Sequence, residues 1–144
     1  MTRRSSLLAL LGFLLARPLG ALAAWNEQAF GAKTAADALK GIGASAPAPS
    51  KDIVIDAPQI AENGAVVPIE ISSNIPGTSS LAVVLEKNPF PLAAKFDFME
   101  GAAPFVKLNV KMAETADVRV VATAGGRHYS ATREIKVTIG GCGG

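Results

Sequence analysis

From residue 53 onwards, apolar and polar side chains alternate with a period of two, which is typical of half-buried β-strands. Seven short runs are expected to be strands, at residues 53–55, 67–71, 81–85, 94–98, 106–112, 118–122 and 129–139; the run at 53–55 is wholly apolar, and in the run at 81–85 Leu81, Val83 and Leu85 form one face. Gly125-Gly126 separates the last two runs and predicts a tight hairpin. The pattern predicts an all-β fold, an immunoglobulin-like antiparallel β-sandwich over residues 51–139. One face of each strand is expected to be buried, and the other solvated or covered by a partner.

Pro68 lies inside the second of these runs, between Val67 and Ile69. Proline has no N–H to donate to a β-ladder. We therefore expect this strand to lie at the edge of its sheet or to carry a bulge at Pro68.

Before the strands, residues 25–43 have a helical period. Thr34 and Asp37 fit a capping box, in which the Thr34 hydroxyl bonds the Asp37 amide and the Asp37 carboxylate reaches back. One apolar face follows, formed by Ala35, Ala38, Leu39 and Ile42. We expect Gly41 and Gly43 to end this helix, and Trp25 and Phe30 to anchor it by simple packing. The Gly, Ala, Ser and Pro residues of 43–50 predict a linker, so residues 24–50 form a helical lead and linker.

The first 23 residues are typical of a signal peptide. Arg3-Arg4 precedes an apolar run at residues 7–16, and Ala21-Leu22-Ala23 provides a small-x-small cleavage site. The paired arginines resemble a twin-arginine signal, which exports folded proteins. An ordinary Sec signal and an N-terminal membrane anchor are the alternatives, although the run is shorter than the ~20 residues that a spanning helix needs.

Composition narrows the function classes. The chain has 144 residues, 49% of them hydrophobic and 18% charged, which argues against wholesale disorder. A single Cys excludes an internal disulfide, and a single His excludes a His-cluster zinc site. Without the first 23 residues, 11 basic and 12 acidic residues remain, a net charge of −1. Strong electrostatic attraction to nucleic acid or anionic membranes therefore has no basis.

No catalytic constellation is visible in the strands. His128 lies beside the hairpin and is expected to be a surface or strand residue. The carboxylates are scattered, mostly at the ends of strands, and lie at Asp52, Asp56, Glu62, Glu70, Asp97, Glu100, Glu114, Asp117 and Glu134. No metal or cofactor site is expected. Phe90 lies in a rigid loop between Pro89 and Pro91, where it is either part of a turn or a protein contact.

The last five residues are Gly140, Gly141, Cys142, Gly143 and Gly144. Glycine samples φ of either sign, so we expect residues 140–144 to form a flexible arm thin enough to enter a channel on another protein. An exported free thiol is unusual, because such thiols normally form disulfides. Cys142 could join two chains by a disulfide, act as a prenylation signal, or precede a terminal thiocarboxylate. The first alternative stays open; prenylation needs three following residues, and thiocarboxylate chemistry belongs to the cytosol.

The remaining interpretation is a carrier arm whose thiolate holds a substrate covalently while partner enzymes act on it. Nothing in the tail would activate the thiol, so activation is expected from the partner. A thiol oxidoreductase is the weaker alternative, since it would need the second Cys of a C-x-x-C motif.

The tail and leader, together with four further stretches, make the chain resemble the SoxY family. These stretches are residues 60–68 (IAENGAVVP), 86–89 (EKNP), 111–115 (KMAET) and 137–139 (VTI). SoxY is the sulfur-carrier subunit of the bacterial thiosulfate-oxidising Sox system. The resemblance implies a periplasmic carrier that is not an enzyme and binds thiosulfate-derived sulfur on Cys142.

The resemblance also implies partners. A SoxZ-like subunit would form a heterodimer with the chain. Haem-containing SoxAX-like, dimanganese SoxB-like and molybdenum/haem SoxCD-like enzymes would act on the bound sulfur in transient contacts. The alternative from a different class is an exported structural or adhesion β-domain that dimerises through a Cys142 disulfide.

Overall fold

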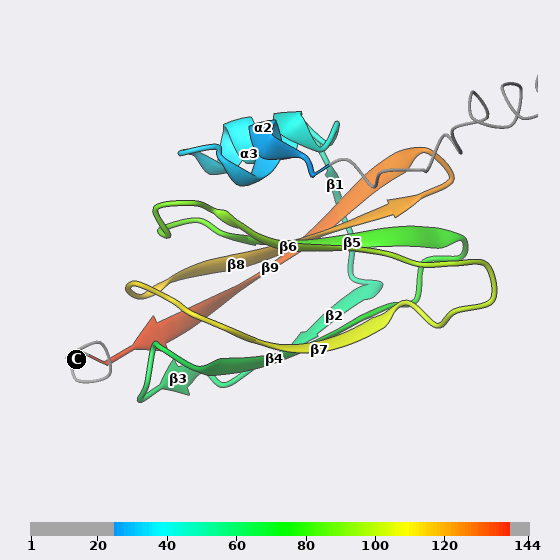
Figure 1. Cartoon of the computed structure of the whole chain (residues 1–144). Coiled ribbons are helices and arrows are strands. Elements are labelled where there is room, and N and C mark those ends of the chain that lie inside the picture. Colours follow the sequence, from blue (N-terminus) through cyan, green and yellow to red (C-terminus); the bar gives the residue numbers. More distant parts are fainter. Residues whose placement is uncertain (1–24, 139–144) are drawn as a thin grey trace, which may run out of the picture.

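The computed structural model describes residues 25–138, which form two packed β-sheets with two short helices over one of them (Figure 1). The larger sheet has the order β1 (Ala48–Pro49), β9 (Arg127–Val137), β8 (Ala116–Ala124), β5 (Thr78–Leu85) and β6 (Leu92–Asp97), and β3 (Ile60–Ala61) also pairs with β9. The smaller sheet has the order β2 (Ile53–Asp56), β4 (Val67–Ser73) and β7 (Phe105–Val110). The predicted all-β sandwich with a short N-terminal helical segment is confirmed. No helix within residues 25–138 is long and apolar enough to span a membrane.

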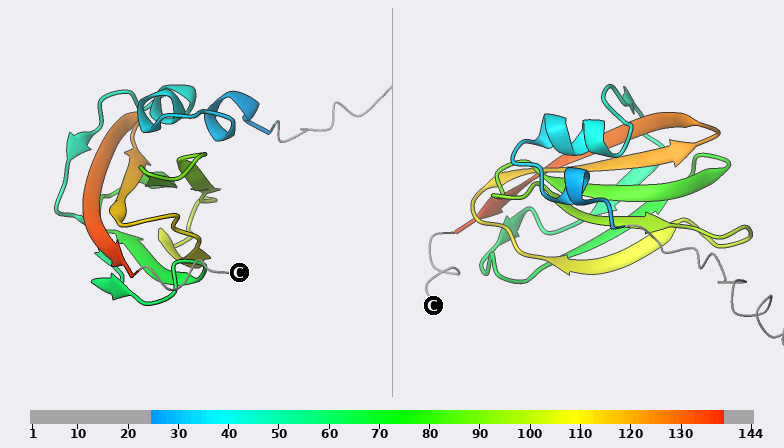
Figure 2. Two further views of the ribbon diagram at one scale, coloured as in Figure 1. Left: turned by 90° about the vertical axis from the view of Figure 1, so that its left-hand side faces the viewer. Right: turned by 45° about the horizontal axis from the view of Figure 1, so that its top comes forward.

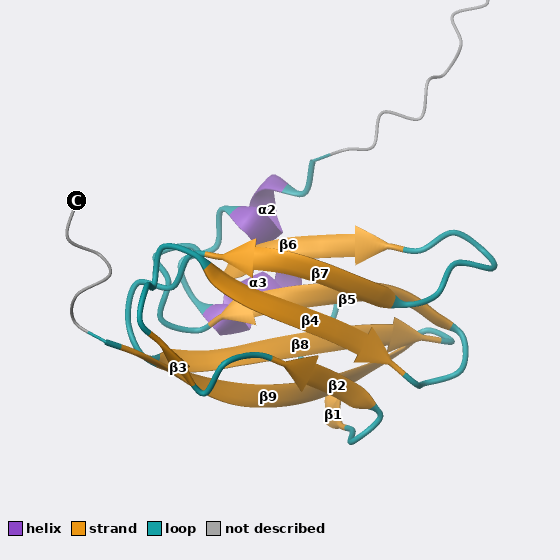
Figure 3. Ribbon diagram, turned by 90° about the horizontal axis from the view of Figure 1, so that it is seen from below, coloured by secondary structure: helices purple, strands orange, loops and turns teal. Residues whose placement is uncertain are grey.

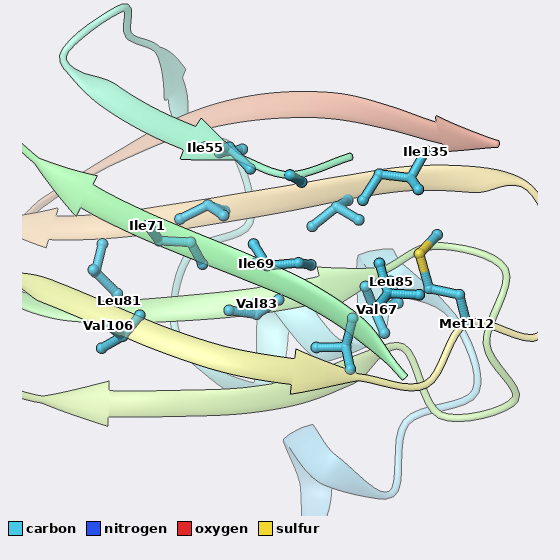
Figure 4. Close-up of a cluster of buried hydrophobic side chains, with 14 of the residues drawn as sticks. Ile55, Val67, Ile69, Ile71, Leu81, Val83, Leu85, Val106, Met112 and Ile135 are labelled. Atoms are coloured by element: carbon cyan, nitrogen blue, oxygen red, sulfur yellow. The ribbon is translucent and has the colours of Figure 1, made fainter. Parts of the chain in front are cut away.

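The core lies between the sheets and follows the alternation in the sequence. Ile69 and Ile71 of β4 are fully buried, as are Leu81 and Val83 of β5. These side chains belong to one cluster that fills the space between the two layers (Figure 4). Each Å² of buried apolar surface contributes about 25 cal/mol, so this layer is the main source of stability.

The predicted hairpin at Gly125-Gly126 is confirmed. Ala124 of β8 pairs with Arg127 of β9, which leaves a loop of two residues. Both glycines have positive φ, +56° and +74°. A two-residue loop with positive φ at both positions suits the twist of the flanking strands, and glycine adopts it without steric cost.

Pro68 was expected to lie in an edge strand or at a bulge. Its strand, β4, is not an edge strand, so the first of these expectations was wrong for β4 as a whole. β4 lies between β2 and β7, as seen from below in Figure 3. Pairing with β2 stops at Glu70, opposite Asp56, whereas pairing with β7 continues past Pro68 opposite Asn109. Pro68 therefore has a neighbouring strand on one side only, which is where a residue without an N–H is tolerated.

The helices are α2 (Glu27–Phe30) and α3 (Ala35–Gly41). The predicted cap forms: the Thr34 hydroxyl accepts the Asp37 amide at 3.1 Å and donates to the Asp37 carboxylate at 2.8 Å. Gly43 follows the helix with φ of +76°, as expected of a terminating glycine. Gly41, by contrast, lies inside the last turn, where a Cβ would come within 2.8 Å of the Ala29 Cα. Gly41 is thus the last residue of α3 and permits the close approach of α2, whereas the positive φ that terminates the helix belongs to Gly43.

The helices cover the outer face of the larger sheet (Figure 2). Ala82 and Val84 of β5 are buried there with Leu39 of α3 and Ala29 of α2, in a second apolar cluster. β5 is therefore buried on both faces. The expectation of a solvated or partner-covered second face was wrong for this strand, because the helices of the same chain cover it.

Trp25 and Phe30 share the anchoring role unequally. Their rings stack with centroids 4.3 Å apart. Phe30 packs against the second cluster, whereas Trp25 remains 66% exposed. Phe30 is therefore the anchor, and Trp25 lies on its outer side.

The outer edge of β9 carries two short parallel strands that the sequence pattern did not indicate. Ala48 and Pro49 of β1, inside the segment expected to be a linker, pair with Tyr129 and Ser130. β3 pairs with Lys136 and Val137. The sandwich is thus antiparallel except along this edge.

Candidate functional site

The predicted site residues, Cys142 with Gly140, Gly141, Gly143 and Gly144, lie outside the described residues, as does the signal peptide at 1–23. What the structure describes is the end of the sandwich from which the chain continues towards them. β9 ends at Val137, and Thr138 is the last residue described.

Three loops meet at this end of the sandwich (Figures 1 and 3). They are residues 62–66 between β3 and β4, 86–91 between β5 and β6, and 111–115 between β7 and β8. We call these loops, with Val137 and Thr138, the tail-base face. Each of the four sequence stretches that resemble SoxY contributes to it.

Asn88 joins two loops of the tail-base face. Its side-chain amide donates to the Lys111 carbonyl at 2.7 Å, and its side-chain oxygen accepts the Ala113 amide at 3.1 Å. Pro89 follows directly and fixes the backbone beyond it. One side chain therefore satisfies two backbone groups across a separation of more than twenty residues.

The third loop and the end of β9 are fastened in the same way. The Met112 amide donates to the Gly64 carbonyl at 2.7 Å. The Thr115 hydroxyl accepts the Val137 amide at 2.9 Å, and the Thr138 amide donates to the Ala61 carbonyl at 3.1 Å. The chain is thus held by hydrogen bonds up to the last described residue before the tail.

Large apolar side chains are exposed around this base. Ile60 and Val66 are 56% and 54% exposed, and Phe90 is 51% exposed. The Lys33 ammonium lies 3.5 Å from the centroid of the Phe90 ring, a cation–π contact. Phe90 is therefore half exposed, and Lys33, from the segment between α2 and α3, lies against one face of its ring.

Three of the other polar candidates, His128, Glu70 and Asp97, have side-chain partners. His128 lies on β9, and its Nδ1 is 3.0 Å from the Thr123 hydroxyl, at the hairpin end of β9 and away from the tail-base face. Glu70 pairs with Lys107, Asp97 with Lys95, and Glu86 with Arg119. Within residues 25–138 no three His, Cys, Asp or Glu side chains gather as a metal site.

These hydrogen bonds hold the three loops and the end of β9 together, so the chain leaves the sandwich at Thr138 from a well-defined surface. Within residues 25–138, the tail-base face consists of loops joined by hydrogen bonds, with exposed apolar and charged side chains around them. Such a face can position a segment and contact another protein.

Comparison with known proteins decides the family. A family model described as "Sulfur oxidation protein SoxY" matches residues 39–142, which is most of the chain and includes Cys142. The chain belongs to the SoxY family. It takes part in a Sox system and has partners within that system.

One solved structure agrees with this assignment, and a second shares the fold. The sulfur carrier protein SoxY from Chlorobium limicola f thiosulfatophilum is 42% identical, with a TM-score of 0.65 over 72% of this chain and 94% of that chain. A superoxide reductase (neelaredoxin) from Ignicoccus hospitalis is 18% identical, with a TM-score of 0.54 over 60% of this chain and 79% of that chain. The second likeness concerns the fold alone. No curated protein matches the chain.

Sequence reasoning did not assign roles to Asn88 and Thr115, the side chains that join the loops of the SoxY tail-base face. Both lie in stretches that carried the family resemblance. Asn followed by Pro at 88–89, in a loop between two strands, was the available signal.

Proposed function

We propose that this SoxY-family protein is a sulfur carrier that binds thiosulfate-derived sulfur covalently on Cys142 and presents it to other Sox proteins. The observation that carries the proposal is the family match, which runs through Cys142, the only Cys of the chain. The 42% identical relative is itself described as a sulfur carrier. The protein is on this proposal a substrate of enzymes and not a catalyst.

The loading step forms one S–S bond. The Cys142 thiol loses its proton and joins the outer sulfur of thiosulfate, giving Cys–S–S–SO₃⁻, one proton and two electrons. A haem-containing SoxAX-like enzyme takes up the two electrons. Hydrolysis of the S–SO₃ bond by a dimanganese SoxB-like enzyme then consumes one water and leaves the persulfide anion Cys–S–S⁻, sulfate and two protons. A molybdenum/haem SoxCD-like enzyme oxidises the remaining sulfane sulfur.

The setting of this chemistry follows from the leader. The twin-arginine-like signal at residues 1–23 directs the protein, already folded, to the periplasm. A SoxZ-like subunit forms a heterodimer with the sandwich, and co-export of a signal-less partner is compatible with transport of a folded complex.

The test compares the native chain with Cys142→Ala. Intact mass spectrometry after incubation with thiosulfate and the haem-containing enzyme is expected to show addition of one S₂O₃ unit to the native chain only. Circular dichroism checks that the variant folds, which is expected because residue 142 lies beyond the last strand.

Equal modification of Cys142→Ala would contradict the proposal. So would a native chain that forms only a disulfide-linked homodimer, because that is the behaviour of a structural or adhesion domain.

A further inference from the structure

We propose that the tail-base face is the surface on which the tail-processing enzymes dock, with Phe90 as its anchor. This inference rests on the proposed carrier function. The partner is an enzyme that takes the tail into a channel and presents, at the channel rim, an apolar recess flanked by acidic side chains.

The length of the tail requires such a contact. Cys142 lies four residues beyond Thr138, so the chain between them spans at most ~14 Å at ~3.5 Å per residue. A standard interface covers about 800 Å² per partner, a patch of about 16 Å radius. An enzyme that holds Cys142 inside a channel therefore covers the loops around Thr138.

Phe90 has the properties of an anchor. Aromatic side chains that fill a partner's recess contribute most to binding when they are pre-organised. Proline on both sides fixes the backbone of Phe90, and Lys33 lies against one face of its ring. Half of the side chain is nevertheless exposed and open to contact.

The charges around Phe90 indicate what the partner's rim carries. Lys33 contacts the ring, and Lys87 lies three residues before it in the same loop. Glu86, the acid of this loop, is paired with Arg119. Beside Phe90 itself the unpaired charges are thus those of Lys33 and Lys87, whereas the acids Glu62 and Glu114 lie in the other two loops of the face. Two lysines next to the ring favour acidic groups beside the partner's recess.

The hydrogen bonds of Asn88 join the loops of this surface to one another. They fix loop 86–91 to loop 111–115, and Thr115 fixes the second loop to Val137. Phe90 and the root of the tail are thus connected through two side-chain bridges. Docking at Phe90 places the start of the tail at a fixed position relative to the partner.

The experiment compares Phe90→Ala with Phe105→Ala in the full chain with its partner subunit. Phe105 is a matched control because it is also 51% exposed and begins β7, at the opposite end of the sandwich. The readout is the rate at which the haem-containing enzyme and thiosulfate modify Cys142, measured by intact mass. Iodoacetamide labelling of Cys142 measures the intrinsic access to the thiol.

We expect Phe90→Ala to lower kcat/KM for enzymatic modification about tenfold or more, with labelling by iodoacetamide unchanged. Phe105→Ala is expected to retain the native rate. Lys87→Glu is expected to lower the rate of association with the enzyme. Added salt should remove the difference between its reaction rate and the native rate.

An unchanged enzymatic rate in Phe90→Ala overturns the docking proposal and leaves the carrier function intact. Loss of the heterodimer in Phe90→Ala also overturns it, because Phe90 then belongs to the subunit interface. If the native chain itself is not modified, the carrier function fails, and the docking proposal fails with it.

Discussion

Gly41 offers a test in which helix propensity and packing predict opposite signs. The residue lies in the last turn of α3, against α2. A Cβ at this position would meet the Ala29 Cα at 2.8 Å, Cβ at 2.9 Å and N at 3.0 Å. The Gly41 carbonyl also accepts a hydrogen bond from the Asn26 side chain at 2.9 Å. Gly41→Ala therefore forces α2 away from α3.

The magnitudes decide the outcome. Alanine is favoured over glycine inside a helix by about 1 kcal/mol. Overpacking a close contact costs about 1–3 kcal/mol, and loss of the Asn26 hydrogen bond costs about 1 kcal/mol. The atoms that obstruct the Cβ include backbone, which cannot rotate aside. We expect Gly41→Ala to lower the free energy of unfolding by about 1–3 kcal/mol, which lowers the Tm by about 4 °C for each kcal/mol.

Tryptophan fluorescence reports the displacement directly. Trp25 is the only Trp of the chain and stacks on Phe30 at the end of α2. A shift of α2 separates the Trp25 ring from its present neighbours, so its emission changes in the folded state of the variant. Thermal unfolding by circular dichroism gives the stability change. Lys40→Ala, at an exposed position of the same helix, is the control and should change neither signal.

A Gly41→Ala variant with a higher Tm and native Trp25 fluorescence would refute the packing argument. Propensity would then dominate, and Gly41 would be a terminating glycine as the sequence pattern suggested.

Two further predictions concern the sandwich itself. Met112 is fully buried at the tail-base face, so Met112→Ala is expected to lower the free energy of unfolding by about 2–5 kcal/mol in a denaturant titration. Met112→Leu should lower it by less than about 1.5 kcal/mol. Equal effects of the two substitutions would count against a close-packed site. The hydrogen bond and charge of Glu70 raise the pKa of Lys107 above 10.5, so the stabilisation by this pair is complete below pH 10.5 and is lost as the pH rises through the raised pKa. The stability difference between the native chain and Lys107→Gln should therefore be constant at neutral pH and shrink in alkaline solution, and a difference that grows there would contradict the assignment.

Local sequence patterns predicted much of the fold because they reflect interactions between residues that are close in the sequence. Thr34 and Asp37 form their cap within one turn of helix, and Gly125-Gly126 forms its hairpin within one turn of chain. The alternation from Val106 to Met112 determines which side chains face the core. Each of these features depends on neighbours in the sequence.

Long-range packing decided what the patterns missed. β5 is apolar at every position from Leu81 to Leu85, which was the signal for a strand buried on both faces. The residues that cover its second face come from α2 and α3, more than forty positions earlier. The role of Gly41 likewise depends on its contact with α2, which the apolar periodicity of α3 does not reveal.

The same limit applies to the site. Cys142 and its glycines stood out in the sequence because composition alone marks them. The bridges of Asn88 and Thr115 connect loops separated by more than twenty residues, and only the folded sandwich brings their partners together. The sequence could indicate the tail, and the structure was needed for its base.

The pairing of β9 has a mechanical consequence. This strand is bonded along one edge to β8, from Ala116 to Ala124, and along the other to the short strands β1 and β3. A pull on the C-terminal tail in the direction of the strand loads these hydrogen bonds in shear, so that many of them share the force at once. A force that a partner applies to the C-terminal end of β9 is therefore distributed over many hydrogen bonds, and we expect the sandwich to stay folded under it.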